Sequence, residues 1–379
     1  MPLRSGGALE NEHLRGEVNS GLNARGLPRT FKPSKVGTST SSLAMAYSIQ
    51  RKVFYGGTFR VFYFYAVGSE IVVKKSADGV LWQTENSPGF GASSYFYSRA
   101  GGLDVLLDSD KIYAQILCYS AVVDYTTQFK KGTLNTTISW GSEKTIFTNA
   151  NYHIGGSLTK LTTGRLYSAV QVAASPQVNG SYSDDDGENW TKNINIGTTT
   201  ITSTTGGVQI LAMATGKAMC LVKNSVNTLV AFLFNGSTWS SLGTVATGLL
   251  SGWGYFTATA VGDVVDVVFI DSAGALKHVR YAGSWGSITT LVSTGCTHPA
   301  IVAGDGGRLY VFYVKDAEIK LLKFDGASWL SEKKAFTGHT YNNPAYLSSN
   351  QNVQNRKICL VWTEGTASPY EVWFCYLED

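Results

Sequence analysis

The sequence predicts an all-β protein in which seven similar units each fold as a four-stranded antiparallel sheet. Two observations lead to this prediction: a sequence pattern that recurs along the chain, and a composition that favours strands over helices. The 379 residues include 41 glycines, 20 tyrosines and 17 phenylalanines, and 44% of the residues are apolar. Such a composition is typical of apolar strands that are joined by tight turns.

The recurring pattern has two lines that advance together. The first is a turn, often followed by a basic residue and then an apolar strand, and the second is a strand and a turn that end in tryptophan. Both lines return roughly every 50 residues, which is hard to obtain by chance. The first line is marked by Arg60, Lys111, Arg165, Lys217, Asp263, Arg308 and Arg356, and the second by Trp82, Trp140, Trp190, Trp239, Trp285 and Trp329.

The unit near the end of the chain contains four strand-length segments, at 299–303, 308–314, 318–324 and 329–336. Four strands in a unit of roughly 45–50 residues are the signature of a β-propeller blade. A single blade leaves both faces of its sheet uncovered, so the blades pack against one another and the ring closes. The sequence therefore predicts a seven-bladed β-propeller over residues 29–379.

The last repeat lacks a fourth strand, because its third strand, 370–377, runs almost to the end of the sequence. Residues 30–36 precede the first full repeat and are long enough for one strand. We expect this N-terminal strand to complete the last blade and close the ring, which removes an open sheet edge. Pro33 suits an edge strand, where no ladder donor is needed. Residues 1–28 are polar and are expected to form an arm outside the propeller.

Charge and hydropathy argue against several classes of protein. The net charge is +4 and only 15% of the residues are charged, so nucleic-acid binding through a basic patch is not expected. No apolar stretch is long enough to span a membrane, and the N-terminus lacks the apolar core of a secretory signal peptide. We therefore expect synthesis in a cytoplasm, followed by incorporation in a virion or another extracellular particle. Four of the five cysteines lie in apolar strand-like runs and are expected to be buried free thiols; they are Cys118, Cys220, Cys359 and Cys375.

The most specific motif is the acidic turn, residues 183–190, which has the form Ser-x-Asp-x-Gly-x-x-Trp. Its serine and aspartate can satisfy backbone N–H groups, its glycine takes a conformation that other residues avoid, and its tryptophan anchors the hairpin. We interpret its acidic residues as solvated turn formers, and no metal or cofactor is expected. The motif positions are Ser183, Asp185, Gly187 and Trp190, with a less complete copy at Ser76, Asp78, Gly79 and Trp82.

This turn resembles the Asp-box of the sialidase-like, or BNR-repeat, β-propellers, and residues 283–329 resemble a repeat of seven-bladed bacterial lectin propellers. Those lectins bind sugars in pockets between blades, so the resemblance implies carbohydrate binding. Sialidases use three arginines that clamp a carboxylate, a Tyr–Glu pair and an aspartic acid on the central face. The arginines of the repeat all open second strands and look like repeat positions rather than a clamp; they are Arg60, Arg165, Arg308 and Arg356.

Aromatic and histidine side chains recur in the connections between repeats. Rings that stack on sugar faces beside polar neighbours are a plausible recognition surface on the face that these connections form. The alternative is that the same side chains fill the seams between blades. The candidates are Phe90, Tyr152, His153, Trp253, Tyr255, His298, His339 and Tyr341. The three histidines belong to different blades and are not expected to share a metal.

The sequence leaves three functions open. The first is a non-catalytic, lectin-like binding or adhesion module of a phage or viral particle, which recognises a glycan or another virion protein and forms a homo-oligomer through its arm. The second is an exo-acting glycoside hydrolase of sialidase type, for which the sequence pairs no two carboxylates. The third is an intracellular protein-interaction propeller, which the missing Trp-Asp repeat signatures disfavour. Whether the protein is an enzyme stays open, with the balance towards binding.

Overall fold

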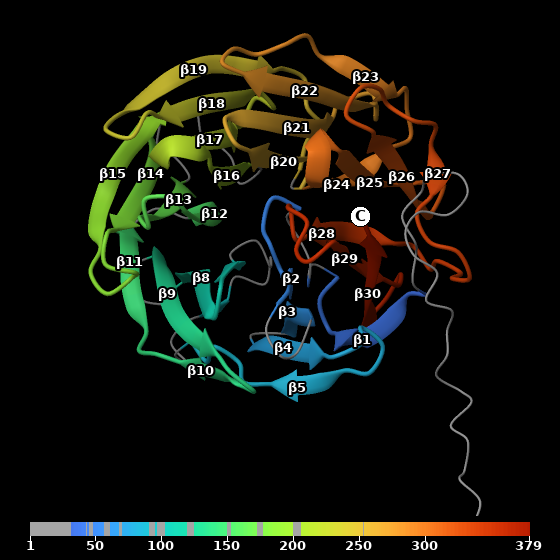
Figure 1. Ribbon diagram of the computed structural model, residues 1–379, viewed down its shortest axis with the longest axis horizontal. Coiled ribbons are helices and arrows are strands. Elements are labelled where there is room, and N and C mark those ends of the chain that lie inside the picture. The colour runs from blue at the N-terminus through green and yellow to red at the C-terminus, as the bar shows by residue number, and fades with distance from the viewer. Residues whose placement is uncertain are drawn as a thin grey trace, which may run out of the picture.

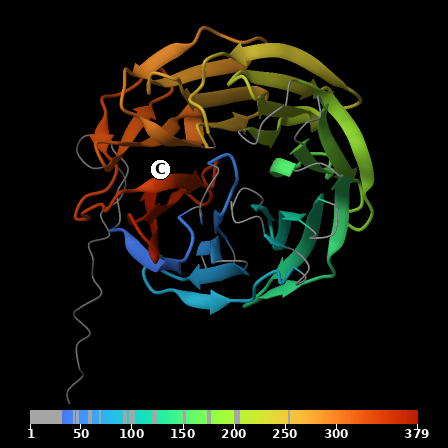
Figure 2. The same ribbon diagram turned by 180° about the vertical axis from the view of Figure 1, so that it is seen from behind.

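The computed structural model describes residues 32–379, apart from 43, 45–47, 57–60, 68–69, 91–94, 97–102, 120–124, 150–152, 173–176, 200–205 and 253. Its strands form antiparallel sheets arranged as a ring, which Figures 1 and 2 show from the two faces. Six of the sheets have four strands each, in agreement with the predicted propeller blades. The expected arm, residues 1–28, lies outside the described residues.

Each four-stranded blade runs from an innermost to an outermost strand, and five blades use strands that are consecutive in the sequence. The first of these blades contains β2 (Val53–Tyr55), β3 (Val61–Val67), β4 (Glu70–Ser76) and β5 (Gln83–Glu85). The second contains β12 (His153–Lys160), β13 (Leu166–Val172), β14 (Gln177–Ser183) and β15 (Thr191–Thr198). The third contains β16 (Gly207–Ala212), β17 (Ala218–Lys223), β18 (Leu229–Phe234) and β19 (Trp239–Ala246). The next two are β20 (Phe256–Val261), β21 (Val264–Ile270), β22 (Leu276–Ala282) and β23 (Thr289–Val292); and β24 (Thr297–Ala303), β25 (Leu309–Lys315), β26 (Glu318–Phe324) and β27 (Lys333–Lys334).

The remaining sheet has six strands, so the prediction of seven equal four-stranded blades is wrong for this part of the ring. Two strands, β6 and β7, both pair with β8, and two others, β10 and β11, both pair with β9. The inner and outer strands of this sheet are therefore each in two pieces. Its strands are β6 (Tyr95–Phe96), β7 (Asp104–Asp108), β8 (Lys111–Tyr119), β9 (Tyr125–Leu134), β10 (Ile138–Trp140) and β11 (Lys144–Asn149).

The sixth four-stranded blade joins segments from the two ends of the described chain. It contains β28 (Ala345–Ser349), β29 (Lys357–Glu364), β30 (Tyr370–Glu378) and, at its outer edge, β1 (Ser34–Ser39). Ser34 lies opposite Phe374 in the β1–β30 ladder, and Lys35 forms an ion pair with Glu371 at 2.6 Å. The strand begins later than the expected residues 30–36, of which the first two are outside the described residues.

The core lies in the seams between neighbouring sheets. In the seam between the β24–β27 and β28–β30 blades, Phe336 and Trp362 are buried and stack with ring centroids 5.5 Å apart. The second strands β25 and β29 are buried along almost their whole length, because other blades cover both of their faces. This packing accounts for the continuous apolar runs of the repeat. All five cysteines are buried thiols, as the sequence predicts for the four that lie in apolar runs.

The centre of the ring is occupied by residues 48–52, which we call the central segment. Its side chains and backbone bond to the inner strands of separate blades: Gln50 donates to the carbonyl of Gly156 at 2.7 Å, and Ser48 donates to the carbonyl of Phe256 at 3.1 Å. From a third blade, Ser348 donates to the carbonyl of Gln50 at 2.7 Å. Ile49 is buried in the largest apolar cluster. The central segment therefore fills the middle of the ring between these inner strands.

A buried carboxylate anchors the central segment to two sheets. Asp104 of β7 is 0% exposed and accepts hydrogen bonds from the backbone N–H of Arg51 at 2.8 Å and of Leu158 at 2.7 Å. Its side chain also forms an ion pair with the Arg51 guanidinium at 3.1 Å and accepts from the Ser157 hydroxyl. Asp104 therefore ties together the central segment, β7 and β12.

Two short 3-10 helices occur among the described residues, η1 (Ala214–Gly216) and η2 (Asp305–Gly307). Within the described part of the chain there is no helix with the length and apolar character that a membrane crossing requires.

Candidate functional site

A cleft of about 530 Å³ lies between the β24–β27 blade and the β28–β30 blade. We call it the first cleft. It is bordered by the segments that lead into β24 and β28 and by the hairpins that join the second and third strands of both blades. Its lining includes Thr297, His298, Lys315, Asn343, Tyr346 and Tyr370. The cleft thus lies on the face that the blade-to-blade connections form.

Two residues with ring side chains that line the first cleft have a strained backbone conformation. His298 has φ 48° and Tyr346 has φ 53°, in the left-handed region that non-glycine residues rarely occupy. Both follow the first residue of an inner strand, where the pairing with the second strand shifts register. Such a bulge changes the direction of a side chain. Together the two bulges bring the His298 and Tyr346 rings into contact, with centroids 4.7 Å apart.

A third ring extends this group, which we call the aromatic group: Tyr255, His298 and Tyr346. The Tyr255 ring lies 5.8 Å from the His298 ring and comes from the preceding blade. Burial lowers the pKa of His298 to about 4 and raises the pKa of both tyrosines. All three rings are therefore uncharged at neutral pH. The site offers flat aromatic faces with hydroxyl and imidazole groups rather than a concentrated charge.

A second set of rings supports the wall of the first cleft from behind. His339 packs between Trp373 and Tyr341, with centroid distances of 4.4 Å and 4.8 Å. Its Nε2 lies 2.8 Å from Oε1 of Glu364, a buried carboxylate that also accepts from Nε1 of Trp362 at 2.7 Å.

The same carboxylate holds the connection that forms the wall. The second oxygen of Glu364 accepts from the backbone N–H of Asn342 at 3.0 Å. Asn342 directly precedes Asn343 and Pro344, which line the first cleft. His339 and Tyr341 therefore help to fix the wall, and neither is among the lining residues.

The remaining sequence candidates lie elsewhere. Phe90 is buried among apolar residues that include Phe54 and Ile71, so it fills a seam. His153 is buried against Phe147 at a centroid distance of 5.1 Å, and burial lowers its pKa to about 3. Tyr152 and Trp253 lie outside the described residues. Across the described ranges no three metal-binding side chains gather, and the three candidate histidines contact different aromatic neighbours.

Three lining residues of the first cleft were not among the candidates chosen from the sequence: Tyr346, Tyr370 and Lys315. A signal for Tyr346 existed, because it follows His298 by the same number of residues as Arg356 follows Arg308. The repeat therefore places His298 and Tyr346 at equivalent positions of consecutive blades. The other two residues carry no such signal, since each stands at the end of an ordinary apolar strand.

The acidic turn, residues 183–190, lies on the opposite face of the ring. Its side chains make local hydrogen bonds: Ser183 Oγ accepts from the backbone N–H of Gly187 at 2.9 Å, and Asp185 Oδ1 accepts from that of Asn189 at 2.8 Å. Trp190 packs edge-on against Phe129 of the neighbouring sheet. The copy at 76–82 repeats the pattern, with Ser76 accepting from Gly79 and Asp78 from Leu81.

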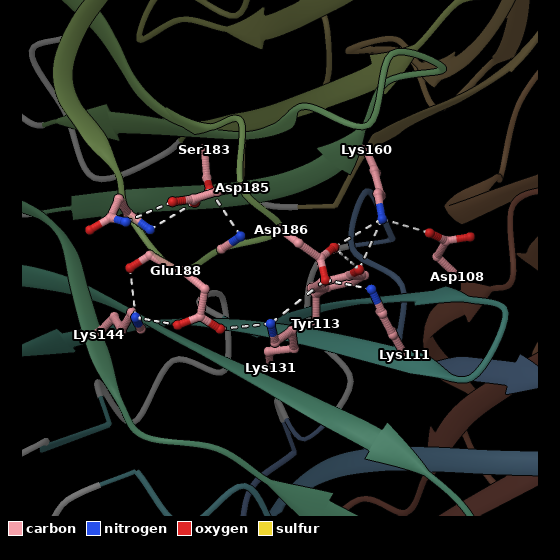
Figure 3. A network of polar contacts seen from close by, with 12 residues as sticks. Asp108, Lys111, Tyr113, Lys131, Lys144, Lys160, Ser183, Asp185, Asp186 and Glu188 are labelled. Carbon is pink, nitrogen blue, oxygen red and sulfur yellow. Dashed lines mark hydrogen bonds and ion pairs between the residues drawn. The ribbon is translucent and has the colours of Figure 1, made fainter.

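The interpretation of the acidic residues as solvated turn formers is wrong for Asp186. This side chain forms ion pairs with Lys111 at 2.6 Å and Lys160 at 3.1 Å, and it accepts from the hydroxyl of Tyr113 (Figure 3). Partial burial opposes its ionisation, but these hydrogen bonds outweigh burial and hold its pKa far below the usual range. The Glu188 carboxylate forms ion pairs with two lysines of the six-stranded sheet, which lies next to the acidic turn. The acidic turn therefore bonds two sheets together.

Replacing Asp186 by asparagine is expected to lower the free energy of unfolding by about 1–3 kcal/mol, because Lys111 loses the carboxylate it pairs with and, of its described carboxylate partners, Lys160 keeps only Asp108. Asparagine tolerates the left-handed backbone at this position, where φ is 62°, so the change tests charge rather than strain. Urea unfolding measures the effect. The matched control is Asp184→Asn, whose exposed pair with Arg165 is expected to contribute less than about 1 kcal/mol. Equal losses for both variants would contradict a bonding role for Asp186.

The described arginines do not form a carboxylate clamp. Each is bound to a carboxylate or terminal oxygen of the chain: Arg51 to Asp104, Arg165 to Asp184, Arg280 to Asp266, and Arg308 and Arg356 to Asp379. Arg60 lies outside the described residues. Within the described part of the chain, the three arginines that a sialidase brings together are therefore not found at one place.

Solved structures with different activities share this ring of sheets. The lectin BP39L from Burkholderia pseudomallei has a TM-score of 0.67 at 13% identity, over 86% of this chain and 96% of the lectin. The polysaccharide lyase Uly1 has a TM-score of 0.55 at 8% identity, over 92% of this chain and 99% of the lyase. The sialidase of Trypanosoma rangeli, in complex with the inhibitor DANA, has a TM-score of 0.53 at 15% identity, over 92% of this chain and 59% of the sialidase.

This chain has the β-propeller fold of these proteins. No protein-family model matches the sequence, and no curated protein matches it. Because one fold hosts many activities, the similarity does not transfer a ligand or a reaction to this propeller. Its function has to be argued from its own clefts and side chains.

Proposed function

We propose that this propeller is a non-catalytic carbohydrate-binding protein, and that the first cleft takes the sugar. The observation that carries the proposal is the aromatic group beside a cleft lined by hydroxyl and amide side chains. Aromatic faces pack against the C–H surface of a sugar ring, and neighbouring polar groups bond to its hydroxyls. The volume of about 530 Å³ is within the range of small-ligand sites.

The backbone strain supports the same proposal. Left-handed backbone at a non-glycine residue costs roughly 1 kcal/mol, and both His298 and Tyr346, which line this cleft, have it. Strain of this kind clusters at ligand sites because it fixes a side chain in a direction that relaxed backbone does not give. We infer that the bulges at His298 and Tyr346 pre-arrange the rings for a ligand.

Two features favour binding over a sialidase-type reaction. The central segment fills the part of the ring where the central active site of such an enzyme would lie, and the described arginines are engaged within the chain. We also infer that the six-stranded sheet is the seventh blade, and that the acidic turn is an Asp-box used for fold rather than chemistry. Incorporation in a virion and assembly through residues 1–28 are proposals that rest on the sequence.

The proposal is tested by a glycan array followed by titration calorimetry of the sugars that bind. Tyr346→Asn removes one ring but keeps a residue that accepts left-handed backbone, and it is expected to weaken binding at least about tenfold, or about 1.4 kcal/mol. The control is Tyr182→Asn, a partly buried tyrosine that precedes the acidic turn on the opposite face. Equal affinity of Tyr346→Asn and the unchanged protein would contradict the site. Release of product from a fluorogenic sialoside would contradict the non-catalytic reading.

A further inference from the structure

A second cleft, of about 590 Å³, lies beside the first. It separates the outer part of the β20–β23 blade from the outer part of the β24–β27 blade. We call it the second cleft. Its lining includes Thr289, Thr290, Ser293, Trp329 and Ser331, so it also combines hydroxyl groups with an aromatic ring. Nothing in the proposed function uses this cleft.

The two clefts meet at one hairpin. Lys315, the last residue of β25, lines both of them. The hairpin from β25 to β26 turns in two residues, Asp316 and Ala317, which have left-handed φ of 53° and 54°. This is the geometry of a tight two-residue turn. The clefts are therefore adjacent, and they share the Lys315 side chain at the start of this hairpin.

The charges at this boundary offset one another only in part, because two carboxylates accompany one lysine. Nζ of Lys315 lies 3.6 Å from Oε2 of Glu332, which also accepts from the hydroxyl of Tyr313. Asp316 adds a second carboxylate on the side of the first cleft. Among the described residues, no arginine lines either cleft, and arginine is the side chain best suited to bind a carboxylate in two-point fashion. The continuous surface therefore suits a ligand that is rich in hydroxyl groups and carries no net charge.

We propose that the two clefts are neighbouring subsites for one neutral oligosaccharide that crosses the β25–β26 hairpin. This inference rests on the proposed function and adds the length and the charge of the saccharide ligand to it. One sugar unit contacts the aromatic group in the first cleft, and a unit further along the chain contacts Trp329 in the second. Joining two weak sites through one ligand raises affinity without new kinds of contact.

The test compares binding of the full chain to neutral saccharides of one to six units from the maltose, cellobiose and N-acetyllactosamine series, measured by titration calorimetry. At least one series is expected to bind ten times more tightly as an oligosaccharide than as its monosaccharide. Ser331→Trp places a bulky side chain at an exposed position of the second cleft. It is expected to remove that tenfold gain and to leave monosaccharide binding unchanged.

The matched control is Ser241→Trp, because Ser241 is also exposed and also follows the repeat tryptophan of its blade by two residues. This variant is expected to keep the gain with chain length. Equal affinity for monosaccharide and oligosaccharide, or a gain that survives Ser331→Trp, would overturn the two-subsite inference while leaving the proposed function intact. Tighter binding of a sialylated oligosaccharide than of its neutral counterpart would overturn the neutral ligand class. Absence of binding by every saccharide would overturn the proposed function itself.

Discussion

Replacing Asp104 by asparagine is expected to lower the free energy of unfolding by about 3–5 kcal/mol. The substitution keeps the size of the side chain but removes the charge that faces the Arg51 guanidinium at 3.1 Å. Both groups are almost fully buried, with side-chain exposures of 0% for Asp104 and 12% for Arg51, so water cannot replace the lost partner. Breaking a buried pair from one side leaves an uncompensated charge, which costs far more than the net contribution of the intact pair.

The loss extends beyond one ion pair, because the carboxylate also fixes the central segment to β12 through the N–H of Leu158. Chemical denaturation in guanidinium chloride measures the change in the unfolding midpoint. The control is Asp263→Asn, which breaks an exposed pair with Lys217 and is expected to change stability by less than about 1 kcal/mol. A loss of that small size for Asp104→Asn would mean that the other hydrogen bonds and apolar contacts of the central segment hold it without this carboxylate.

Lowering the pH from 7 to 5 is expected to destabilise the protein through its buried neutral histidines. Burial lowers the pKa of His153 to about 3, whereas an unfolded histidine titrates near 6.5. Between these values the unfolded state binds more protons than the folded state, so stability falls as the pH falls. A histidine of this kind is expected to contribute a loss of about 1–2 kcal/mol over this pH range, and His298 acts in the same direction.

Other shifted groups act outside this range. Hydrogen bonds from lysines lower the pKa of Glu318 to about 2, so its contribution is lost only at more acidic pH. Burial lowers the pKa of Lys52 to about 7, although Asp104 nearby raises it, and burial lowers the pKa of Lys223 to about 8. These lysines change stability mainly above pH 7. The interval from pH 7 to pH 5 therefore reports chiefly on the histidines.

Urea unfolding at pH 7, 6 and 5 tests the expectation with the variant His153→Gln, which cannot become charged. Its stability is expected to depend less on pH than that of the unchanged protein, by about 1–2 kcal/mol across the range. The control is Thr127→Val, which removes the hydroxyl 3.4 Å from Nδ1 of His153 but no titrating group. It is expected to shift the stability equally at all three values. Parallel pH profiles for His153→Gln and the unchanged protein would contradict burial of a neutral imidazole.

The blades could be predicted because their signals are local. Turn residues such as Asp78 and Gly79 and apolar strands such as β25 act within a few residues, and the repeat multiplies them. The central segment could not be predicted, because Ser48 and Gln50 bond to residues more than 100 positions away. The interrupted strands of the six-stranded sheet could not be predicted either, because two separate pieces of chain pair with one partner strand.

The candidate site could be predicted in part for a related reason. The sequence indicator was an aromatic residue in a blade connection, and two of the residues it selected, Tyr255 and His298, belong to the aromatic group beside the first cleft. The sequence could not separate these from Phe90 and His153, because the side chains that bury the latter two lie on different segments. The repeat could have identified Tyr346, because its position in its blade matches that of His298 in the preceding blade. Cleft residues such as Lys315 depend on how two blades face each other, which no local pattern encodes.

The pairing of β1 with β30 also sets the order in which the protein is completed during synthesis. Ser34 faces Phe374, so nearly the whole chain leaves the ribosome between the two strands. At 5–20 residues per second, β1 waits roughly 20–70 s for its partner. A waiting strand is a hazard for aggregation, and the sequence Ser-Lys-Val-Gly-Thr-Ser of β1, with one apolar side chain and a lysine, is poorly suited to self-association. Among the described strands, the one that closes the ring thus waits longest for its partner, and its composition limits the risk of aggregation while it waits.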